Sequence, residues 1–328
     1  MNTVEMSLEA SRIEPAAPAI AVAGVTKRYG QIRAVDGISF TIQPGEVVGF
    51  LGPNGAGKTT TMRMIAHHLC PTSGDIRILG QSSQHAHRDS RQRLGYLPEN
   101  APAYPEMTVG AFLTWTARIK RINKHDRSTR LSAVIETCGL DAVVDRRIGH
   151  LSRGYRQRVG LAQAIIHKPE VLLLDEPLSG LDPNQIEEFK NVIRRYGRSK
   201  TVVFSSHRLP DVEALCDRVI IFYEGRIVAD RKLTEPNWSP ENATFVIVVG
   251  GNSLTRIAPF ISSRAFVTDC QVIARAAAGW TFKVTTTDEE QLRTSLVAAI
   301  IAQGWSVHEF SRQTDGLASM FRQVTQAR

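Results

Sequence analysis

The sequence predicts an α/β fold built on a parallel sheet, followed by a smaller α+β domain. Apolar runs of strand length alternate with segments of helical period as far as about residue 232, which favours a parallel sheet with covered faces. A glycine-rich loop joins one such run to a helix, and beyond residue 240 the order of elements changes. A chain of 328 residues is long enough for about two domains.

The first elements are expected to follow an N-terminal arm. Residues 1–19 show no sustained period and are predicted to be flexible. Alternating apolar residues predict strands at Ile20–Val25 and Ile38–Ile42, and a compact apolar run predicts a buried strand at Val47–Leu51. Apolar residues at three- and four-residue steps predict a helix over Lys58–Leu69.

The rest of the first domain is predicted to be a helical subdomain followed by further strands and helices. Apolar steps of three and four indicate that residues 99–167 are mainly helical. A hairpin is expected around Glu224-Gly225. The later elements are expected at Val171–Leu174 (strand), Ile186–Tyr196 (helix), Val202–Ser205 (strand), Asp211–Cys216 (helix), Val219–Tyr223 (strand) and Arg226–Ala229 (strand).

A change of composition marks the second domain. Two prolines, an asparagine and a serine fall within residues 236–240 and predict a linker. The predicted order beyond it, β-α-β-β-α-β, is that of a ferredoxin-like unit. We therefore expect a first domain at 20–235 and an accessory α+β domain at 236–328. The predicted elements of that domain are Thr244–Val249 (strand), Leu254–Ile261 (helix), Ala265–Ala274 (strand), Thr281–Thr286 (strand), Glu289–Gln303 (helix) and Ser306–Phe310 (strand).

Composition narrows the class of protein without choosing one. The net charge of +8 permits an anionic partner such as nucleotide, nucleic acid or an acidic membrane face. The four cysteines lie far apart and predict neither a disulfide framework nor a zinc site, which fits a reducing cytosol. Residues 1–23 lack a signal-peptide pattern, and the longest apolar runs have the length of strands, so no membrane span is expected.

The strongest chemical signal is a phosphate-binding loop. Residues 52–59 read GPNGAGKT and match the pattern GxxxxGK[ST] between a predicted strand and a predicted helix. Its glycines let successive backbone N–H groups point at phosphate oxygens, and the helix presents its positive end to the same anion. Lys58 is expected to reach the β- and γ-phosphates, and Thr59 to bind Mg²⁺. The residues predicted to bind nucleotide here are Gly52, Pro53, Asn54, Gly55, Ala56, Gly57, Lys58, Thr59 and Thr60.

Two carboxylates follow the predicted strand Val171–Leu174. Asp175 is expected to hold Mg²⁺ or its water, and Glu176 is placed to polarise an attacking water. On its own, an Asp-Glu pair after a strand is more often a helix cap or a solvated turn. Together with the phosphate loop, the pair predicts nucleotide hydrolysis.

These motifs resemble those of the ATP-binding subunits of ABC transporters, over about residues 20–232. The segment LSRGY at 151–155 resembles the family's LSGGQ signature, and SGLD at 179–182 resembles its D-loop. The resemblance implies that Ser152, Gly154 and Asp182 contact nucleotide. Taken alone, Ser152 could equally be only the cap of the helix that follows it.

Three further positions take roles from the same resemblance. Tyr29 stands where the family has an aromatic residue that stacks on adenine, and His207 stands at the switch histidine. Glu99 occupies the Q-loop position, beside Mg²⁺, where the family has glutamine. Singly, Tyr29 would more often be a half-buried core residue and His207 a strand-end histidine. Glu99, in turn, could point away and cap the following helix.

The departures from the family pattern point to one branch. Arg153 replaces the first glycine of the signature, and Tyr155 replaces its glutamine. With the sequence YLPE at 96–99, the chain resembles the gliding-motility type branch of the ABC-2 exporters. The domain ending in Leu317–Val324 resembles the C-terminal extension common in that branch.

The resemblance implies an ATP hydrolase that uses ATP and Mg²⁺. In this family the signature of one chain completes the ATP site of another, so it also implies a head-to-tail dimer with a second ATP-binding subunit; a homodimer is the preferred form and a heterodimer stays open. The dimer would drive a separate transmembrane permease subunit from the cytoplasmic face of the cell membrane, with no nucleic-acid partner.

Two alternatives to a transport subunit are weighed. A soluble ABC ATPase acting on nucleic acid or ribosomes is favoured only by the net charge. A degenerate regulatory module is opposed by the intact Lys58, Asp175, Glu176 and His207. The basic run 118–124 fits either a solvated helix face or a contact to anionic lipid or a partner.

Overall fold

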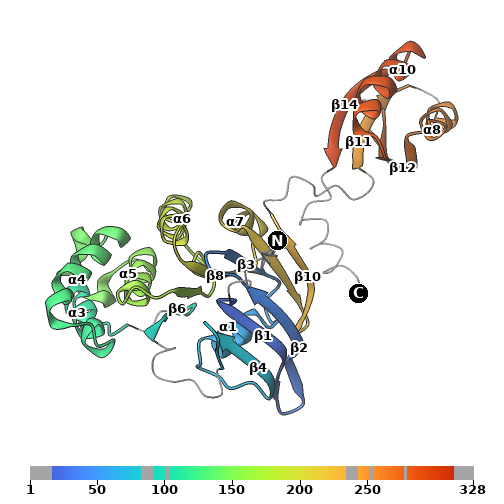
Figure 1. Cartoon of the computed structure of the whole chain (residues 1–328). Coiled ribbons are helices and arrows are strands. Elements are labelled where there is room, and N and C mark those ends of the chain that lie inside the picture. Colours follow the sequence, from blue (N-terminus) through green and yellow to red (C-terminus); the bar gives the residue numbers. More distant parts are fainter. Residues whose placement is uncertain are drawn as a thin grey trace, which may run out of the picture. The chain divides into compact units, whose positions relative to one another are not determined.

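The computed structural model describes residues 17–82, 92–100, 103–233, 243–251, 254–276 and 279–313. Most of the predicted arm, the predicted linker and Leu317–Val324 lie outside these residues. The chain divides into two compact units, Met1–Thr234 and Glu235–Arg328, which are drawn in Figure 1 and described separately here.

A six-stranded sheet in the order β10-β9-β3-β8-β7-β6 forms the centre of the first unit. Its strands are β3 (Val47–Leu51), β6 (Leu94–Leu97), β7 (Val171–Leu174), β8 (Thr201–Ser206), β9 (Arg218–Tyr223) and β10 (Arg226–Lys232). All neighbours pair in parallel except β10, which pairs antiparallel with β9 at the edge. Strands β3, β7 and β8 are buried throughout, as expected for a parallel sheet covered on both faces.

The carboxyl ends of these parallel strands meet at one edge of the sheet. The phosphate loop follows β3, Asp175 follows β7, and His207 follows β8. Glu99 comes shortly after β6, which is the outer neighbour of β7. The topology therefore brings together residues that are more than 100 positions apart in the sequence.

A second, antiparallel sheet packs beside the first. Its order is β2-β1-β4-β5, with β1 (Ile20–Tyr29), β2 (Ile32–Ile42), β4 (Ser73–Ile78) and β5 (Gln81–Ser82). One apolar core joins the two sheets and α1 (Lys58–Ile65), and the rings of Phe40 and Phe50 meet edge to face with 5.5 Å between their centroids. The prediction that this helix runs to Leu69 is wrong. The helix ends at Ile65 and the chain turns at His67, whose φ is 57°.

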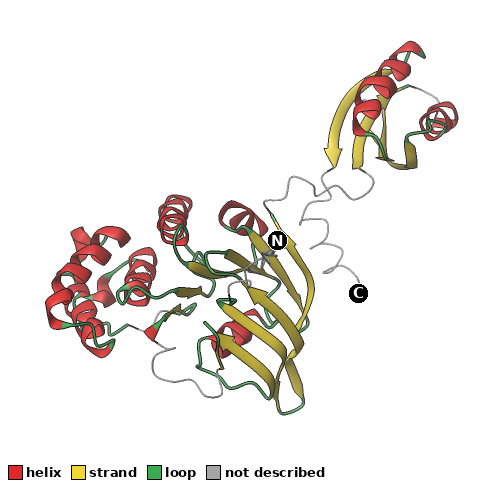
Figure 2. Ribbon diagram, viewed as in Figure 1, coloured by secondary structure: helices red, strands yellow, loops and turns green. Residues whose placement is uncertain are grey.

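Three helices form a group at the β6 side of the central sheet, where α5 contacts β6 (Figure 2). They are α3 (Val109–Ile119), α4 (Lys124–Cys138) and α5 (Arg153–Ile165), with short 3₁₀ turns η2 (Asp141–Val143) and η3 (Ile148–His150) between α4 and α5. Thr108 caps α3 by accepting a hydrogen bond from the Ala111 amide. The buried face of α3 carries Phe112 and Leu113, whereas Trp115 and Ile119 are exposed.

Helices α6 (Pro183–Gly197) and α7 (Leu209–Leu215) complete the first unit. Helix α6 follows β7 and has Asp182 as its N-cap, and α7 follows β8 directly after His207 and Arg208. Each helix therefore starts from the strand edge at which the candidate site lies.

The second unit has the ferredoxin-like arrangement that the order of its elements predicts. Its sheet order is β12-β13-β11-β14, and every neighbouring pair is antiparallel. Phe245, Phe282, Ile257 and Leu296 are buried in its separate core. The elements are β11 (Ala243–Gly250), α8 (Leu254–Ser262), β12 (Val267–Ala276), β13 (Gly279–Thr286), α9 (Glu289–Gln291), η4 (Leu292–Leu296), α10 (Val297–Ala302) and β14 (Ser306–Gln313).

Candidate functional site

The phosphate loop adopts a backbone that only glycine tolerates at two of its turns. Gly55 and Gly57 have φ angles of 81° and 101°. A Cβ atom on Gly57 would lie 2.8 Å from the Ala34 carbonyl oxygen, and one on Gly52 would lie 2.4 Å from the Phe222 carbonyl oxygen. The loop therefore packs closely against neighbouring backbone just before the N-terminus of α1.

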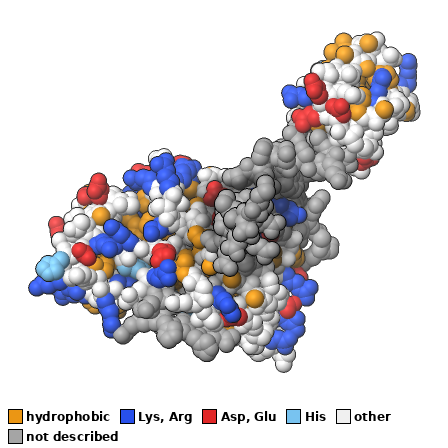
Figure 3. All heavy atoms as spheres, in the orientation of Figure 1, with side chains coloured by type: hydrophobic (Ala, Val, Ile, Leu, Met, Phe, Trp, Pro, Cys, Tyr) orange, Lys and Arg blue, Asp and Glu red, His pale blue; other side chains and the backbone are white. Residues whose placement is uncertain are grey.

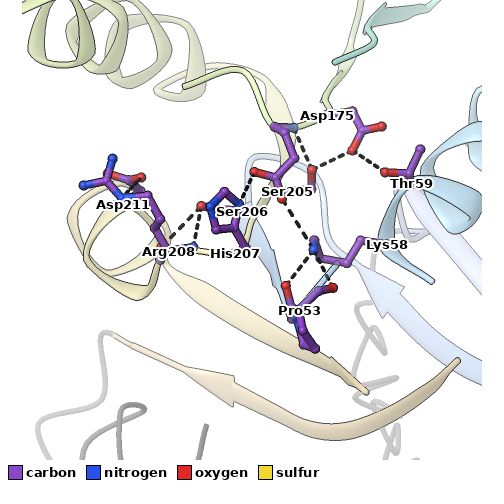
Figure 4. Close-up of polar contacts among 11 residues, drawn as sticks. Pro53, Lys58, Thr59, Asp175, Ser205, Ser206, His207, Arg208 and Asp211 are labelled. Atoms are coloured by element: carbon purple, nitrogen blue, oxygen red, sulfur yellow. Dashed lines mark hydrogen bonds and ion pairs between the residues drawn. The ribbon is translucent and has the colours of Figure 1, made fainter. Parts of the chain in front are cut away.

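Lys58 is held at the start of α1 and is 5% exposed. Its Nζ donates to the carbonyl oxygens of Gly52 at 2.6 Å and Pro53 at 3.1 Å, and it lies 3.4 Å from Oε1 of Glu176 (Figure 4). Burial lowers the pKa of Lys58, and the charge of Glu176 opposes that shift. The ammonium group is thus fixed at the mouth of the loop, facing the side from which an anion would enter.

One carboxylate oxygen of Asp175 accepts hydrogen bonds from two hydroxyl groups. Its Oδ1 accepts from Thr59 Oγ1 at 3.1 Å and from Ser205 Oγ at 2.7 Å. Its Oδ2 is buried and has no hydrogen-bond partner among the described residues. Burial raises the pKa of Asp175, and the hydrogen bond from Ser205 opposes that shift. A hard cation prefers oxygen ligands, so the free carboxylate oxygen and the Thr59 hydroxyl fit Mg²⁺.

Glu176 is fixed from three sides. Its Oε2 lies 2.9 Å from Nδ1 of His207, its Oε1 faces Lys58, and its amide donates to Ser205 Oγ at 2.8 Å. Its φ of 45° is a strained value for a residue with a side chain. The Ser205 hydroxyl therefore anchors both acidic residues, and the sequence reasoning did not assign it a role. A polar residue at the carboxyl end of a buried strand, next to the one that carries Asp175, was the available signal.

Lys58, Thr59, Glu176 and His207 line one cavity of about 320 Å³, whereas Asp175 and Ser205 are not among its lining residues. Ala34, Glu99 and Ser179 lie on its wall together with the loop, Glu176 and His207, so residues from five separate segments face the same space. The complete lining is Ala34, Asn54, Gly55, Ala56, Gly57, Lys58, Thr59, Thr60, Glu99, Glu176, Ser179 and His207.

Glu99 lies within electrostatic reach of the two charged groups at the centre of the site. Burial has the largest effect on the pKa of both Lys58 and Asp175, and the charge of Glu99 is among the causes that raise each of them. Its carbonyl oxygen accepts from Gln157 Nε2 at 3.2 Å. The next helix begins at Val109 with Thr108 as its cap, so Glu99 does not cap it.

The predicted site residues that do not line this cavity are Tyr29, Gly52, Pro53, Ser152, Gly154, Asp175 and Asp182. Tyr29 is 48% exposed, and the Lys27 Nζ lies 5.3 Å from its ring centroid. Ser152 caps α5 by accepting from the Tyr155 amide at 3.4 Å, and Asp182 caps α6 by accepting from the Gln185 amide at 2.9 Å.

Gly154 lies against α6. A Cβ atom there would lie 2.4 Å from Gln185 Oε1, so a larger residue at this position would displace the flexible Gln185 side chain. The signature residues therefore have local structural roles within their own chain.

Comparison with known proteins gives a consistent result. The family model described as "ABC transporter" matches residues 35–179. The "Uncharacterized ABC transporter ATP-binding protein YxlF" of Bacillus subtilis (strain 168) is 33% identical over 310 residues, which are 94% of this chain and 100% of that protein. The "Bacitracin transport ATP-binding protein BcrA" of Bacillus licheniformis is 35% identical over 236 residues, 68% of this chain and 76% of that protein.

Solved structures show the same fold. One described as the dimeric structure of a bacterial ABC transporter cassette superimposes with a TM-score of 0.61 at 24% identity, covering 65% of this chain and 98% of that chain. No helix among the described residues is both long and apolar enough to cross a bilayer.

Proposed function

This chain belongs to the ABC transporter family of ATP-binding proteins, and we propose that it is the ATP-hydrolysing subunit of an ABC-2-type exporter, of the gliding-motility type branch, that works with a separate transmembrane chain. The observation that carries the proposal is the single cavity in which Lys58, Glu176 and His207 meet the phosphate loop. The cavity thus holds an anion-binding cation, a carboxylate and an imidazole side by side, which is what hydrolysis of a phosphate anhydride needs.

The phosphates of ATP would lie along the loop, where backbone N–H groups and the N-terminus of α1 favour negative charge. Lys58 would exchange its contacts to the Gly52 and Pro53 carbonyl oxygens for the β- and γ-phosphates. Thr59 and Asp175 would hold Mg²⁺, with Glu99 near its outer shell. When bound, Mg²⁺ would neutralise charge that develops on the phosphate oxygens.

Glu176 is the proposed base that orients the attacking water. Its carboxylate is fixed by His207 Nδ1 on one oxygen and by Lys58 on the other. Once Lys58 turns to the phosphates, Oε1 is free to accept a proton from water, while His207 keeps the carboxylate aimed. A positioned general base of this kind contributes about 10²–10⁴-fold to the rate.

The active unit is proposed to contain two chains. Ser152, Gly154 and Asp182 lie at helix starts outside the cavity, so they cannot contact nucleotide held there by their own chain without a rearrangement. In a head-to-tail homodimer, each chain would present these residues to the phosphate loop of the other. The dimeric solved cassette with the same fold supports this arrangement.

The membrane partner is proposed to dock near Glu99 and α3. Tyr104 is 54% exposed, and its ring meets the exposed Trp115 ring edge to face with 5.1 Å between centroids. Ile119, one turn further along α3, is 56% exposed. An exposed apolar surface that begins five positions along the chain from the cavity-lining Glu99 would let a partner sense nucleotide. The chain would then sit on the cytoplasmic face of the cell membrane.

The alternative of a nucleic-acid or ribosome ATPase gains no support. On the face shown in Figure 3, Lys and Arg side chains are interspersed with acidic and polar groups rather than gathered in one stripe. BcrA, one of the relatives, is by its name a transport protein.

Co-purification tests the proposal. Tagged Glu176→Gln chain, with ATP and Mg²⁺ present throughout, is captured from detergent-solubilised membranes of its own organism. We expect it to retain a multi-span membrane protein in a complex with two copies of the chain. Lys58→Ala is the matched control, because it should fail to hold the nucleotide-bound form. A nucleic acid or a ribosome retained instead, with no membrane protein, would overturn the proposal.

A further inference from the structure

A buried ion pair lies outside the cavity and has no part in the chemistry proposed above. Lys190 of α6 and Asp211 of α7 place Nζ and Oδ1 3.3 Å apart, with side chains that are 8% and 3% exposed. Burying two charges costs free energy unless they are paired well, and such pairs are weak evidence for stability by themselves. A pair kept in this position therefore calls for a role other than holding the fold.

The two helices that the pair connects each start at the site. Helix α6 begins after its cap Asp182, and α7 begins at Leu209, two residues after His207. Asp211 is in the first turn of α7, so its carboxylate is close to the segment that carries His207. The ion pair thus ties the start of α7 to the body of α6.

Asp211 also reaches back to the His207 segment. Its Oδ2 faces Nε of Arg208 at 3.6 Å and has no hydrogen-bond partner among the described residues. The Arg208 amide donates to Ser206 Oγ at 2.9 Å, and Figure 4 shows these residues side by side with His207. The carboxylate is therefore the centre of a chain of contacts from Lys190 to the residue next to His207.

The other polar contacts of α6 near this pair do not replace it. Glu187 lies 3.2 Å from the Lys190 Nζ, but its side chain is 59% exposed and belongs to the same helix. Arg194 donates to the Ala214 carbonyl oxygen at a long 3.4 Å, at the far end of α7. Exposed or distant contacts contribute little to fixing a loop.

We propose that Asp211, paired with Lys190, is a positioning residue for ATP hydrolysis: it holds the His207 segment on α6 so that the imidazole stays on the Glu176 carboxylate. The inference rests on the proposed role of His207. The Lys190–Asp211 ion pair would thus affect hydrolysis through the position of His207, without touching substrate or metal.

The test compares ATP hydrolysis and thermal unfolding in the purified full chain. Asp211→Asn keeps the shape of the side chain and removes its charge. The matched control is Asp230→Asn, because Asp230 forms a tight pair with Arg218 at 2.6 Å at the opposite end of the sheet. We expect both variants to melt at lower temperature, and only Asp211→Asn to lose about tenfold or more in kcat, with KM for ATP within about twofold.

A double variant separates positioning from folding. Lys190→Met with Asp211→Asn removes both charges, so the buried cation that the single variant leaves with only the exposed Glu187 as partner is gone and Tm should recover. Because the link between the helices is still absent, kcat should stay low. Recovery of both Tm and kcat in the double variant, or an equal loss of kcat in Asp230→Asn, would overturn the proposal.

His207→Ala, measured in the same assay, tests the premise separately. If that variant keeps parental turnover, the proposed role of His207 fails, whatever Asp211→Asn does. If His207→Ala is inactive and Asp211→Asn keeps full kcat, the proposed function stands and the positioning role of Asp211 is wrong.

Discussion

Replacing Ser205 by alanine removes one hydroxyl that serves both acidic residues of the site. In the parent chain, Ser205 is fully buried and its Oγ bridges the Asp175 carboxylate and the Glu176 amide. Asp175 Oδ1 would keep its bond from Thr59, while the Glu176 amide would be left buried without an acceptor. The same amide belongs to a residue with a φ of 45°, so the strained backbone would lose its anchor.

The expected size follows from these contacts. A buried polar group left unpaired costs about 1–3 kcal/mol, and one lost hydrogen bond to a charged group adds about 1.5–3 kcal/mol before relaxation. We therefore expect Ser205→Ala to be about 2–4 kcal/mol less stable. For catalysis, a displaced Glu176 forfeits part of the 10²–10⁴-fold effect of a general base, so we expect kcat to fall about 10–100-fold.

The assay measures phosphate release under saturating ATP and Mg²⁺, with urea unfolding on the same samples. Thr201→Val is the control, because Thr201 is buried at the other end of the same strand and its hydroxyl accepts only the Gly45 amide, at 3.0 Å, among the hydrogen bonds found. It should lose stability with little change in kcat. A Ser205→Ala chain that is destabilised and yet turns over ATP like Thr201→Val would refute the reasoning.

Four further outcomes are expected. Lys58→Ala should abolish turnover and weaken ATP binding in a nucleotide-binding titration, because the buried cation facing the phosphates is lost. Glu176→Gln should bind ATP and accumulate as a closed dimer on size exclusion with Mg²⁺. Glu99→Gln should show a shallower dependence of ATP affinity on Mg²⁺ than the parent, because a carboxylate repels the triphosphate when no cation compensates it. Burial lowers the pKa of His167 to about 4, so unfolding free energy should fall by roughly 2–3 kcal/mol as pH drops from about 6.5 towards 4, and His167→Gln should flatten that dependence.

Each of these has a clear contrary result. Parental turnover in pure Lys58→Ala would remove the phosphate-loop assignment, and a monomeric Glu176→Gln chain with bound ATP would count against the two-chain site. Superimposable Mg²⁺ curves would show that Glu99 lies outside the ligand shell. For His167, the unfolded chain binds more protons than the folded chain between the two pKa values, so stability must rise with pH there; a flat profile would contradict its burial as a neutral ring.

The elements of the fold were largely predictable because their patterns are local. The apolar run Val171–Leu174 and the glycine loop after Val47–Leu51 each carry their own signal, and the order of elements after residue 242 indicated the antiparallel arrangement of the second unit. The helix expected to reach Leu69 failed because apolar spacing continues past Ile65 while the backbone turns. The short strand β4 was missed because Ser73–Ile78 has little apolar alternation.

Site residues that belong to a sequence motif could be predicted, whereas residues whose role depends only on their contacts in the folded chain could not. Lys58, Asp175 and Glu176 follow from spacing and residue type. Ser205 does not, because its two partners come from a neighbouring strand that pairing in the sheet brings close. The burial of Asp211 could not be predicted either. A carboxylate in the first turn of a helix ordinarily lies in solvent, where its charge interacts favourably with the helix dipole.

Mixing two inactive variants tests most directly the claim that two chains share each ATP site. Lys58→Ala lacks the phosphate-loop cation but keeps its signature residues, and Ser152→Arg with Gly154→Val blocks the signature but keeps Lys58. Steady-state hydrolysis is measured for each variant alone and for the mixture, after exchange of subunits. The two-chain site predicts that only the mixture hydrolyses ATP, because one of its two sites combines an intact loop with an intact signature. Full activity of the signature variant alone, or a mixture as inactive as its parts despite proven exchange, would contradict it.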